Sequence, residues 1–160
     1  MSLCLHVRRF SELSASEVYE ILKARFSVFV TEQHIHYLDE DDIDYVSTHF
    51  ALRRGDTVIA YARLFEDTDK DILIVGRMLT TERGKGYGKY VMEQIIEEAK
   101  SRGARLLRLH AQAQVAEFYE HLGFHTVGDI FIEAELPHIL MELAINVQRD
   151  DVQCTKEMKK

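Results

Sequence analysis

A glycine-rich turn near the middle of the sequence constrains the fold more than any other feature of the chain. Three of the eight glycines, at positions 84, 86 and 88, fall within five residues. The turn follows an apolar run at 72–79 and precedes a segment in which Val91, Ile95 and Ala99 recur at helical spacing. Glycine lets a backbone turn with its N–H groups pointing inward, and a helix N-terminus adds partial positive charge. The pattern therefore predicts a strand, an anion-binding turn and a helix, with a phosphate as the favoured anion.

Cationic residues accompany this turn, namely Arg83, Lys85 and Lys89. Taken alone, the turn fits a surface loop with solvated basic residues equally well. A P-loop is excluded, because Gly84 and Gly88 are separated by three residues rather than four and Lys89 is followed by Tyr90. A dinucleotide-binding fingerprint is also excluded, because the third glycine comes one residue early and the turn follows a strand in mid-chain.

The remaining sequence alternates between strand and helix patterns. Ser14 and Glu17 have the spacing of a capping box, which predicts a helix of about four turns that reaches Val30. Gly55-Asp56 indicates a hairpin, and Gly103 is expected to cap a helix that ends near Arg102. A short helix is expected to stop at Gly123. Strands are expected at 3–7, 48–53, 58–65, 72–79, 106–109, 126–132 and 139–145. We therefore predict one α+β domain over 1–147, followed by a polar tail at 148–160.

The composition agrees with a globular chain of one domain. Its 160 residues are 46% hydrophobic and 29% charged, which excludes disordered, collagen-like and coiled-coil chains. No apolar run is long enough to span a bilayer, and the first residues lack a targeting pattern. The net charge of −7 argues against binding of nucleic acid by the whole surface. Cys4 and Cys154 are too few for a disulfide scaffold, so we expect a reduced, cytoplasmic setting.

Two segments carry a family resemblance. Residues 83–88, Arg-Gly-Lys-Gly-Tyr-Gly, match a pattern of Arg or Gln, two residues, Gly, one residue, then Gly or Ala. Residues 118–124, Phe-Tyr-Glu-His-Leu-Gly-Phe, follow it with a predicted strand between them. Because the two segments occur in this order with a strand between them, the chain resembles the GNAT superfamily of acetyl-CoA-dependent N-acetyltransferases.

Three further segments resemble the ElaA-like branch of that superfamily. They are Phe-Val-Thr-Glu-Gln at 29–33, His-Ala-Gln-Ala at 110–113, and Pro137-His138-Ile139 followed by Met141. Two departures stand out. Glu135 occupies a position where the branch usually has glycine, and Ile35 and His36 replace the Cys and Pro often found after Glu-Gln. The shape of the loop at 135 and the acceptor specificity are therefore expected to differ.

The resemblance implies a fold and a coenzyme site. The expected fold is an α/β/α sandwich, with a GNAT-type mixed, mostly antiparallel sheet of about six to seven strands and about four helices. The fourth strand, 72–79, would splay from the fifth, 105–110, and the pantetheine arm of acetyl-CoA would enter between them. No metal is implied. The implied coenzyme-binding residues are Met78, Leu79, Arg83, Gly84, Lys85, Gly86, Tyr87, Gly88, Lys89 and Gln112.

The resemblance also implies a general acid. Tyr119 matches the tyrosine that lies near the coenzyme sulfur, where a phenol can donate a proton to the departing thiolate. The alternative is an aromatic residue that only packs, as Phe118 does. The general base is left open, because 72–79 contains no carboxylate. The base candidates are His110, Glu133, His138 and Glu32, and a chain of water molecules is the other possibility.

An acidic stretch follows the first helix. Five of the six residues at 39–44 are Asp or Glu, and they either attract a cationic amine or form a solvated loop. An EF-hand is excluded, because the loop that starts at Asp39 has Asp44 at position six and Phe50 at position twelve. His34 and His36 lie beside these acids without a further patterned ligand, so no metal site is predicted.

These observations predict an enzyme that moves acetyl from acetyl-CoA to a primary amine by direct attack in a ternary complex. No paired nucleophile suggests a covalent intermediate. The alternative is a catalytically weak coenzyme-A-binding sensor or regulatory module of the same fold. The expected partners are acetyl-CoA and a small amine or peptide amine, with no nucleic acid and no membrane. Homodimer formation is left open.

Overall fold

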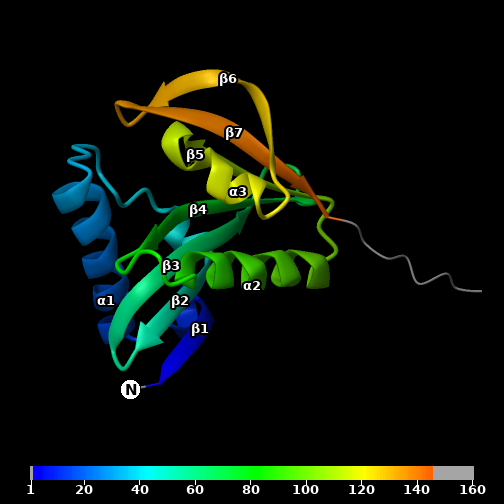
Figure 1. The fold of residues 1–160 in the computed structure, drawn as a ribbon. Coiled ribbons are helices and arrows are strands. Elements are labelled where there is room, and N and C mark those ends of the chain that lie inside the picture. Colours follow the sequence, from blue (N-terminus) through cyan, green and yellow to red (C-terminus); the bar gives the residue numbers. More distant parts are fainter. Residues whose placement is uncertain (1, 146–160) are drawn as a thin grey trace, which may run out of the picture.

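A seven-stranded mixed sheet forms the centre of the structure, a computed structural model that describes residues 2–145 (Figure 1). The strand order is β1-β2-β3-β4-β5-β7-β6, and every neighbouring pair is antiparallel except β4 and β5. The strands are β1 (Leu3–Arg9), β2 (Thr48–Arg54), β3 (Thr57–Glu66), β4 (Ile72–Thr80), β5 (Leu106–Gln112), β6 (His125–Glu133) and β7 (Leu136–Ala144). This confirms the predicted sheet. The domain end at 147, the tail at 148–160 and Cys154 lie outside the described residues.

Helices cover both faces of the sheet. The described residues contain three α-helices, α1 (Ala15–Arg25), α2 (Tyr87–Ser101) and α3 (Ala116–Glu120), together with a π-helical segment, Phe26–Glu32. α1 lies on one face, while α2 and α3 lie on the other (Figure 1). The strand residues alternate accordingly, because Ala60 and Ala62 of β3 join the cluster under α2, whereas Tyr61 joins the cluster under α1.

The first helix was predicted to reach Val30, but its α-helical part ends at Arg25 and a π-helical segment continues to Glu32. The start of α1 and the end of α2 follow the sequence signals. The Ser14 hydroxyl accepts a hydrogen bond from the backbone N–H of Glu17 at 3.1 Å, and the Glu17 carboxylate accepts one from the Ser14 N–H at 3.2 Å. This confirms the capping box. At the end of α2, Gly103 adopts φ +71° and the Ala104 N–H donates to the Ala99 carbonyl at 3.0 Å, which is a Schellman arrangement.

The sheet opens between its two parallel strands. β4 and β5 pair only from Ile72 with Leu106 to Val75 with Leu109. Beyond that point β4 continues to pair with β3 alone, and β5 continues to pair with β7 alone. The predicted splay is therefore present, and it leaves the inner edges of two strands facing each other without strand partners.

A bulge in β4 accompanies this opening. Between the pairs Arg63 with Gly76 and Tyr61 with Leu79, β4 contains one residue more than β3. Arg77 lies in this bulge and adopts φ +56°, which non-glycine residues rarely do. The bulge therefore changes the direction of β4 just where it leaves β5.

The turn between β6 and β7 is tight and strained. Ala134 and Glu135 connect the strands and have φ values of +48° and +64°. Two-residue hairpins favour such values, and glycine or asparagine usually supplies them. Glu135 therefore keeps the short turn but places a side chain where glycine is better suited.

We predict that Glu135→Gly stabilises the protein. A side chain in the left-handed region costs about 1–2 kcal/mol, and the extra freedom of glycine in the unfolded chain offsets about half of that. The free energy of unfolding from urea titration should rise by about 0.5–1 kcal/mol. Glu97→Gly, at an exposed position inside α2, makes the same exchange in helical backbone and should lower it by about 1 kcal/mol. A destabilised Glu135→Gly variant would contradict the strain at this turn.

Candidate functional site

The glycine loop, residues 83–88, has backbone geometry that only glycine adopts readily. Gly84 and Gly86 have φ values of +74° and +78°, and Gly86 is the N-cap of α2. A Cβ atom built on either residue would meet no atom within 4 Å apart from the residue itself and its two chain neighbours. The space beside both residues is therefore open, and the first N–H groups of α2 are available to an anion.

Gly88 has a different role from its two neighbours. It lies in the first turn of α2 and is buried. A Cβ on Gly88 would come within 2.9 Å of the Met78 Cε atom, 3.2 Å of Thr80 Cγ2 and 3.5 Å of Phe118 Cζ. The missing side chain thus lets α2, β4 and α3 pack closely at the open end of the splay.

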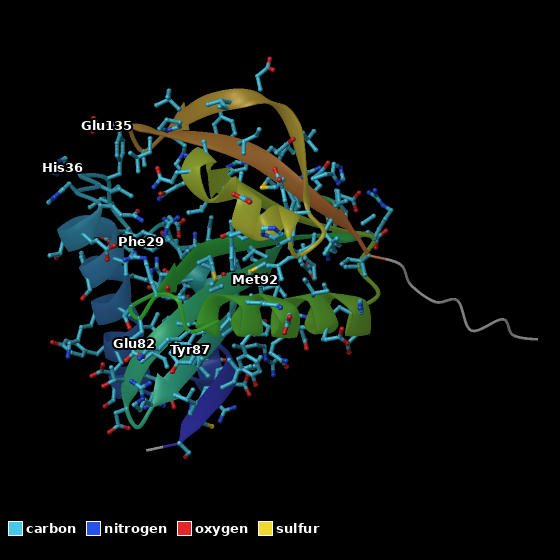
Figure 2. All side chains as sticks on the ribbon, viewed as in Figure 1. Phe29, His36, Glu82, Tyr87, Met92 and Glu135 are labelled. Atoms are coloured by element: carbon cyan, nitrogen blue, oxygen red, sulfur yellow. The ribbon has the colours of Figure 1, made fainter. Side chains whose placement is uncertain are left out.

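An ion-pair network supports the base of the glycine loop. The Arg54 guanidinium donates to both carboxylate oxygens of Glu82, and it also donates to the Tyr87 hydroxyl at 3.1 Å. Lys85 Nζ donates to Glu82 at 3.3 Å. Figure 2 shows Glu82 and Tyr87 together beside the N-terminal end of α2. A single β2 residue, Arg54, thereby binds a residue on each side of the turn.

The three cations of the glycine loop and the start of α2 all have carboxylate partners. Lys85 pairs with Glu82, three positions away in the sequence, and Lys89 pairs with Glu93, four positions away. Arg83 instead pairs with Glu32, the last residue of the π-helical segment after α1. The positive charges are therefore present at the turn but are partly neutralised.

Tyr119 is buried on α3, with 7% of its surface exposed. Its ring centroid lies 5.0 Å from that of Phe118 and 5.9 Å from that of Phe124, both in edge-on contacts. Burial raises the pKa of the Tyr119 phenol above its usual value near 10. The hydroxyl therefore keeps its proton at neutral pH.

Three of the base candidates lie together on the face of the sheet opposite α3. His110 Nδ1 lies 3.1 Å from Glu133 Oε1, and His138 Nε2 lies 3.8 Å from Glu133 Oε2. His138 is buried, and its Nδ1 lies 2.8 Å from the Leu136 carbonyl oxygen. The Phe131 ring stacks on His138 and meets His110 edge-on. β5, β6 and β7 thus assemble residues that are far apart in sequence.

Gln112 links this cluster to the region after α1. It pairs directly with His138 across β5 and β7, and its Nε2 donates to Gln33 Oε1 at 2.8 Å. The backbone of Gln33 continues the π-helical pattern, because its N–H donates to the Val28 carbonyl at 3.0 Å. π-Helical turns are frequent at functional sites. The segment after α1 is therefore anchored to the open end of β5.

The acidic stretch corrects the sequence interpretation. Asp39, Asp41 and Asp44 neither form a solvated loop nor face a substrate freely, because three arginines bind them. The bonds are Arg25 Nε to Asp39 at 2.7 Å, Arg25 Nη1 to Asp44 at 2.7 Å, Arg63 Nη1 and Nη2 to Asp41 at 2.7 and 2.6 Å, Arg63 Nη1 to Asp44 at 3.0 Å, and Arg77 Nε to Asp39 at 3.0 Å. Arg25 and Arg63 are almost completely buried, and their positive charges require these carboxylates.

The arginine–aspartate network, formed by the six residues just named, was missed by the sequence reasoning. A signal for it existed, since Arg63 interrupts the apolar run of β3 and a charge buried there needs a partner. Burial by itself would raise the pKa of Asp44, but hydrogen bonds and charge from Arg25 and Arg63 outweigh it, so the pKa lies below its usual value. At Asp41, too, burial alone would raise the pKa, but hydrogen bonds and charge from Arg63 outweigh it and lower the pKa.

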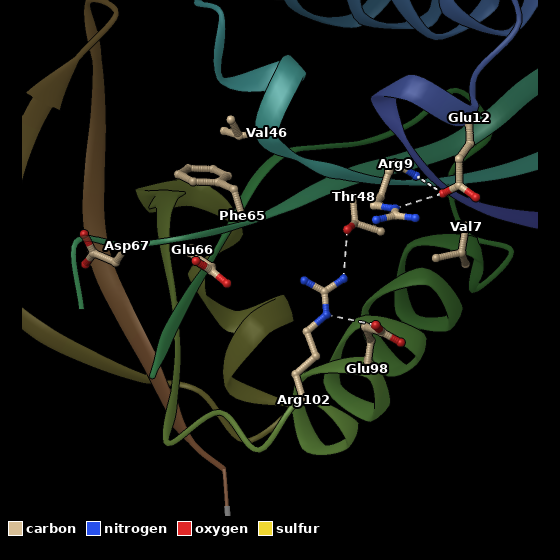
Figure 3. Close-up of a pocket in the computed structure, with 10 residues that line it drawn as sticks. All are labelled: Val7, Arg9, Glu12, Val46, Thr48, Phe65, Glu66, Asp67, Glu98 and Arg102. Carbon is tan, nitrogen blue, oxygen red and sulfur yellow. Dashed lines mark hydrogen bonds and ion pairs between the residues drawn. The ribbon is translucent and has the colours of Figure 1, made fainter. Parts of the chain in front are cut away.

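A cavity of about 600 Å³ lies far from the glycine loop (Figure 3). Glu98 and Arg102 line it from the C-terminal end of α2, while the glycine loop lies at the opposite end of that helix. Arg102 donates to Glu98 at 2.9 Å and to the Thr48 hydroxyl at 2.8 Å, so its charge is already satisfied. The cavity therefore does not contribute to the predicted site.

The described residues contain neither a metal-binding cluster nor a membrane-spanning helix. Over residues 2–145, no group of three or more His, Cys, Asp or Glu side chains is arranged to hold a metal ion, and this range includes His34 and His36. None of the helices in the described part of the chain is both long and apolar enough to cross a membrane.

Comparisons with known proteins agree with this geometry. The model of the acetyltransferase (GNAT) family matches residues 15–124. Protein ElaA of Escherichia coli is 34% identical over 137 residues, which cover 82% of this chain and 90% of ElaA. The crystal structure of E. coli ElaA superposes with a TM-score of 0.82 at 32% identity, covering 88% of this chain and 99% of that one. An acyl-CoA N-acyltransferase from Pseudomonas aeruginosa gives a TM-score of 0.83 at 30% identity, with coverage of 89% and 100%.

We predict that Asp44→Asn destabilises the protein, because it leaves the charges of Arg25 and Arg63 with one carboxylate fewer in a buried setting. The free energy of unfolding at pH 7 should fall by about 3 kcal/mol. The Asp44 pKa is lowered by folding, so its contribution is complete above the ordinary pKa near 3.8 and disappears as the pH falls through the folded-state value.

Urea titrations at several pH values between 7 and 3 would measure both effects. The wild type should lose stability more steeply than Asp44→Asn as the pH falls below about 4. Asp42→Asn is the matched control, because Asp42 is exposed in the same stretch and should change stability by less than about 0.5 kcal/mol. Equal effects of the two variants would contradict a stabilising role for the network.

Proposed function

The chain belongs to the acetyltransferase (GNAT) family, and on that premise we propose that it transfers an acetyl group from acetyl-CoA to a primary amine. Transfer of an acyl group from a coenzyme A thioester is the chemistry of this family. The proposal adds the acetyl group, the amine acceptor and direct attack within a ternary complex.

The observation that carries the proposal is the convergence of three features at the splay. The open glycine loop at the N-terminus of α2, the free inner edge of β4 and the α3 helix that bears Tyr119 meet around Gly88. The absence of any atom beyond the chain neighbours within 4 Å of a Cβ on Gly84 or Gly86 fits a pyrophosphate lying against the backbone. Arg83, Lys85 and Lys89 supply charge of the correct sign beside it.

β4 supplies the groups that would hold the reacting thioester. Beyond Val75 its inner edge has no strand partner, so the backbone groups near Met78 and Leu79 that point toward this edge can bind the pantetheine arm. An N–H aimed at the carbonyl oxygen stabilises the negative charge that develops there during attack, and such a donor typically contributes about 10²–10³ in rate. The bulge at Arg77 orients this part of the strand.

Tyr119 is proposed as the general acid. Its raised pKa keeps the hydroxyl protonated, so the residue can donate a hydrogen bond as negative charge gathers on the leaving sulfur. The packing against Phe118 and Phe124 fixes the direction of the ring and excludes water. A thiolate that leaves without a donor would be higher in energy, and the acyl transfer would be slower.

On the other face of the sheet, His138 is proposed as the general base. If Nδ1 carries the proton and donates to the Leu136 carbonyl, Nε2 has a lone pair free to accept the proton of an attacking amine. Glu133, 3.8 Å from Nε2, then stabilises the imidazolium that forms. His110, which is about half exposed and contacts Glu133, offers the proton a route to solvent. An acid on one face and a base on the other suit an acceptor that arrives opposite the leaving group.

Release of free thiol from acetyl-CoA, measured with a panel of amines, tests the proposed function directly. The panel should include polyamines, amino acids, amino sugars and peptides with free N-terminal or lysine amines. We expect amine-dependent thiol release with at least one class. Coenzyme binding without thiol release by any class would favour a sensor or regulatory module of the same fold.

We predict that coenzyme affinity depends on the glycine loop. Gly86→Val places a branched side chain in the open space of the turn, where the pyrophosphate would lie. Arg83→Ala removes a charge-assisted hydrogen bond to that pyrophosphate, worth about 1.5–3 kcal/mol. Isothermal titration calorimetry should show CoA binding weakened at least tenfold in both variants.

Matched controls separate binding from folding. Gly128 has φ +73° and equally open surroundings in β6, so Gly128→Val introduces similar backbone strain away from the loop. Arg105→Ala removes an exposed arginine that pairs with Asp69. Both controls should bind CoA as the wild type does. Unchanged affinity in the folded Gly86→Val and Arg83→Ala proteins would rule out this loop as the coenzyme site.

We predict that Tyr119→Phe lowers kcat by about 10²–10⁴ while the fold and the affinity for CoA change little. The substitution keeps the ring that packs on Phe118 and Phe124 and removes only the hydroxyl. Steady-state kinetics with an acceptor from the panel would measure it, and Tyr90→Phe on the exposed side of α2 is the control. A kcat within about threefold of the wild-type value would identify Tyr119 as a packing residue only.

A further inference from the structure

The ion pair between Arg83 and Glu32 differs from the other ion pairs of the glycine loop. Lys85 and Lys89 pair with residues three and four positions away in sequence. Glu32 lies instead at the end of the π-helical segment, and three strands, β2, β3 and β4, separate it from Arg83 in the chain. This contact therefore couples the proposed coenzyme loop to the segment that follows α1.

The backbone that carries Glu32 is the more firmly held side of this pair, although the Glu32 side chain is itself 46% exposed. The next residue, Gln33, is held on two sides, by its N–H bond to the Val28 carbonyl at 3.0 Å and by the 2.8 Å bond from Gln112. Arg83 is the adaptable partner, because its side chain is 61% exposed and the two glycines with positive φ follow closely. A change at the loop would therefore move Arg83 more than the backbone that carries Glu32.

One guanidinium cannot give its full hydrogen-bonding capacity to two anions. Arginine binds carboxylate and phosphate through the same planar set of N–H donors. A pyrophosphate in the glycine loop would bring two negative phosphates beside Arg83, and each N–H donor that Arg83 turns toward a phosphate is lost to Glu32. The free energy of the Arg83–Glu32 pair would then oppose coenzyme binding.

We propose that Glu32 is a positioning residue that holds Arg83 in the coenzyme-free protein and competes with the coenzyme pyrophosphate for it. This inference rests on the proposed function, since it takes the glycine loop as the pyrophosphate site. Exposed ion pairs of this kind are weak, so removing the carboxylate should tighten CoA binding by about 1.5-fold to fivefold. The effect should be confined to ligands that carry the pyrophosphate.

Calorimetric titration of Glu32→Gln with CoA and with pantetheine tests this proposal. Pantetheine has the same thiol arm and no pyrophosphate, so its affinity should not change, whereas the Kd for CoA should fall. Glu40→Gln is the matched control, because it makes the same charge change at an exposed residue of the following segment that has no ion-pair partner among the described residues. With acetyl-CoA as substrate, KM should also fall.

The double variant Glu32→Gln with Arg83→Ala completes the test. If Glu32 acts through Arg83, adding Glu32→Gln to Arg83→Ala should leave CoA affinity unchanged. The competition would be overturned if Glu32→Gln raised CoA affinity equally with and without Arg83, or if it raised the affinity for pantetheine as well as for CoA. A higher Kd for CoA in Glu32→Gln would also overturn it. A wild-type protein that does not bind CoA would overturn the proposed function as well, which distinguishes the two failures.

Discussion

The divergence of β4 from β5 is the constraint on which the rest of the structure depends. After Val75 and Leu109 the two strands no longer share hydrogen bonds, although both continue for several residues. Backbone donors and acceptors left unpaired in this way need another partner, and a ligand lying between the strands supplies one. The bulge at Arg77 turns β4 away from β5, and the arginine–aspartate network holds that bulge, because Asp39 binds Arg77 and Arg25 together. A stretch that resembles a substrate-attracting loop thus supports the shape of the site.

The same divergence separates two chemical environments. On one face, α2 and α3 bring the glycine loop and the buried phenol of Tyr119 to the opening, and Gly88 allows these elements to approach closely. On the other face, β5, β6 and β7 bring His110, Glu133 and His138 together, and Gln112 connects them to the segment after α1. Under the proposed mechanism, Tyr119 donates a proton to the leaving thiolate from the first face. His138 accepts the proton of the attacking amine from the second.

Local patterns allowed much of the fold to be predicted from the sequence, because each depends on residues close together in the chain. The capping box at Ser14 and Glu17, the hairpin at Gly55 and the helix cap at Gly103 are all present. The arginine partners of the stretch 39–44 were not predicted, because Arg25, Arg63 and Arg77 come from three other elements. The π-helical turn could not be predicted, since it depends on tertiary contacts such as Gln33 with Gln112. The catalytic roles of Tyr119 and His138 are proposals, and the surroundings of each residue explain why it suits its role.

The central claim, that the coenzyme occupies the splay with its pyrophosphate in the glycine loop, can be tested without knowledge of the acceptor. Backbone amide signals in ¹⁵N-labelled protein would be followed by NMR during titration with CoA. The account predicts the largest shifts at Met78 and Leu79 on β4 and at residues 84–89, with little change around Arg102 and the cavity at the far end of α2. Shifts concentrated at that cavity, with the β4 edge and the glycine loop unaffected, would contradict it.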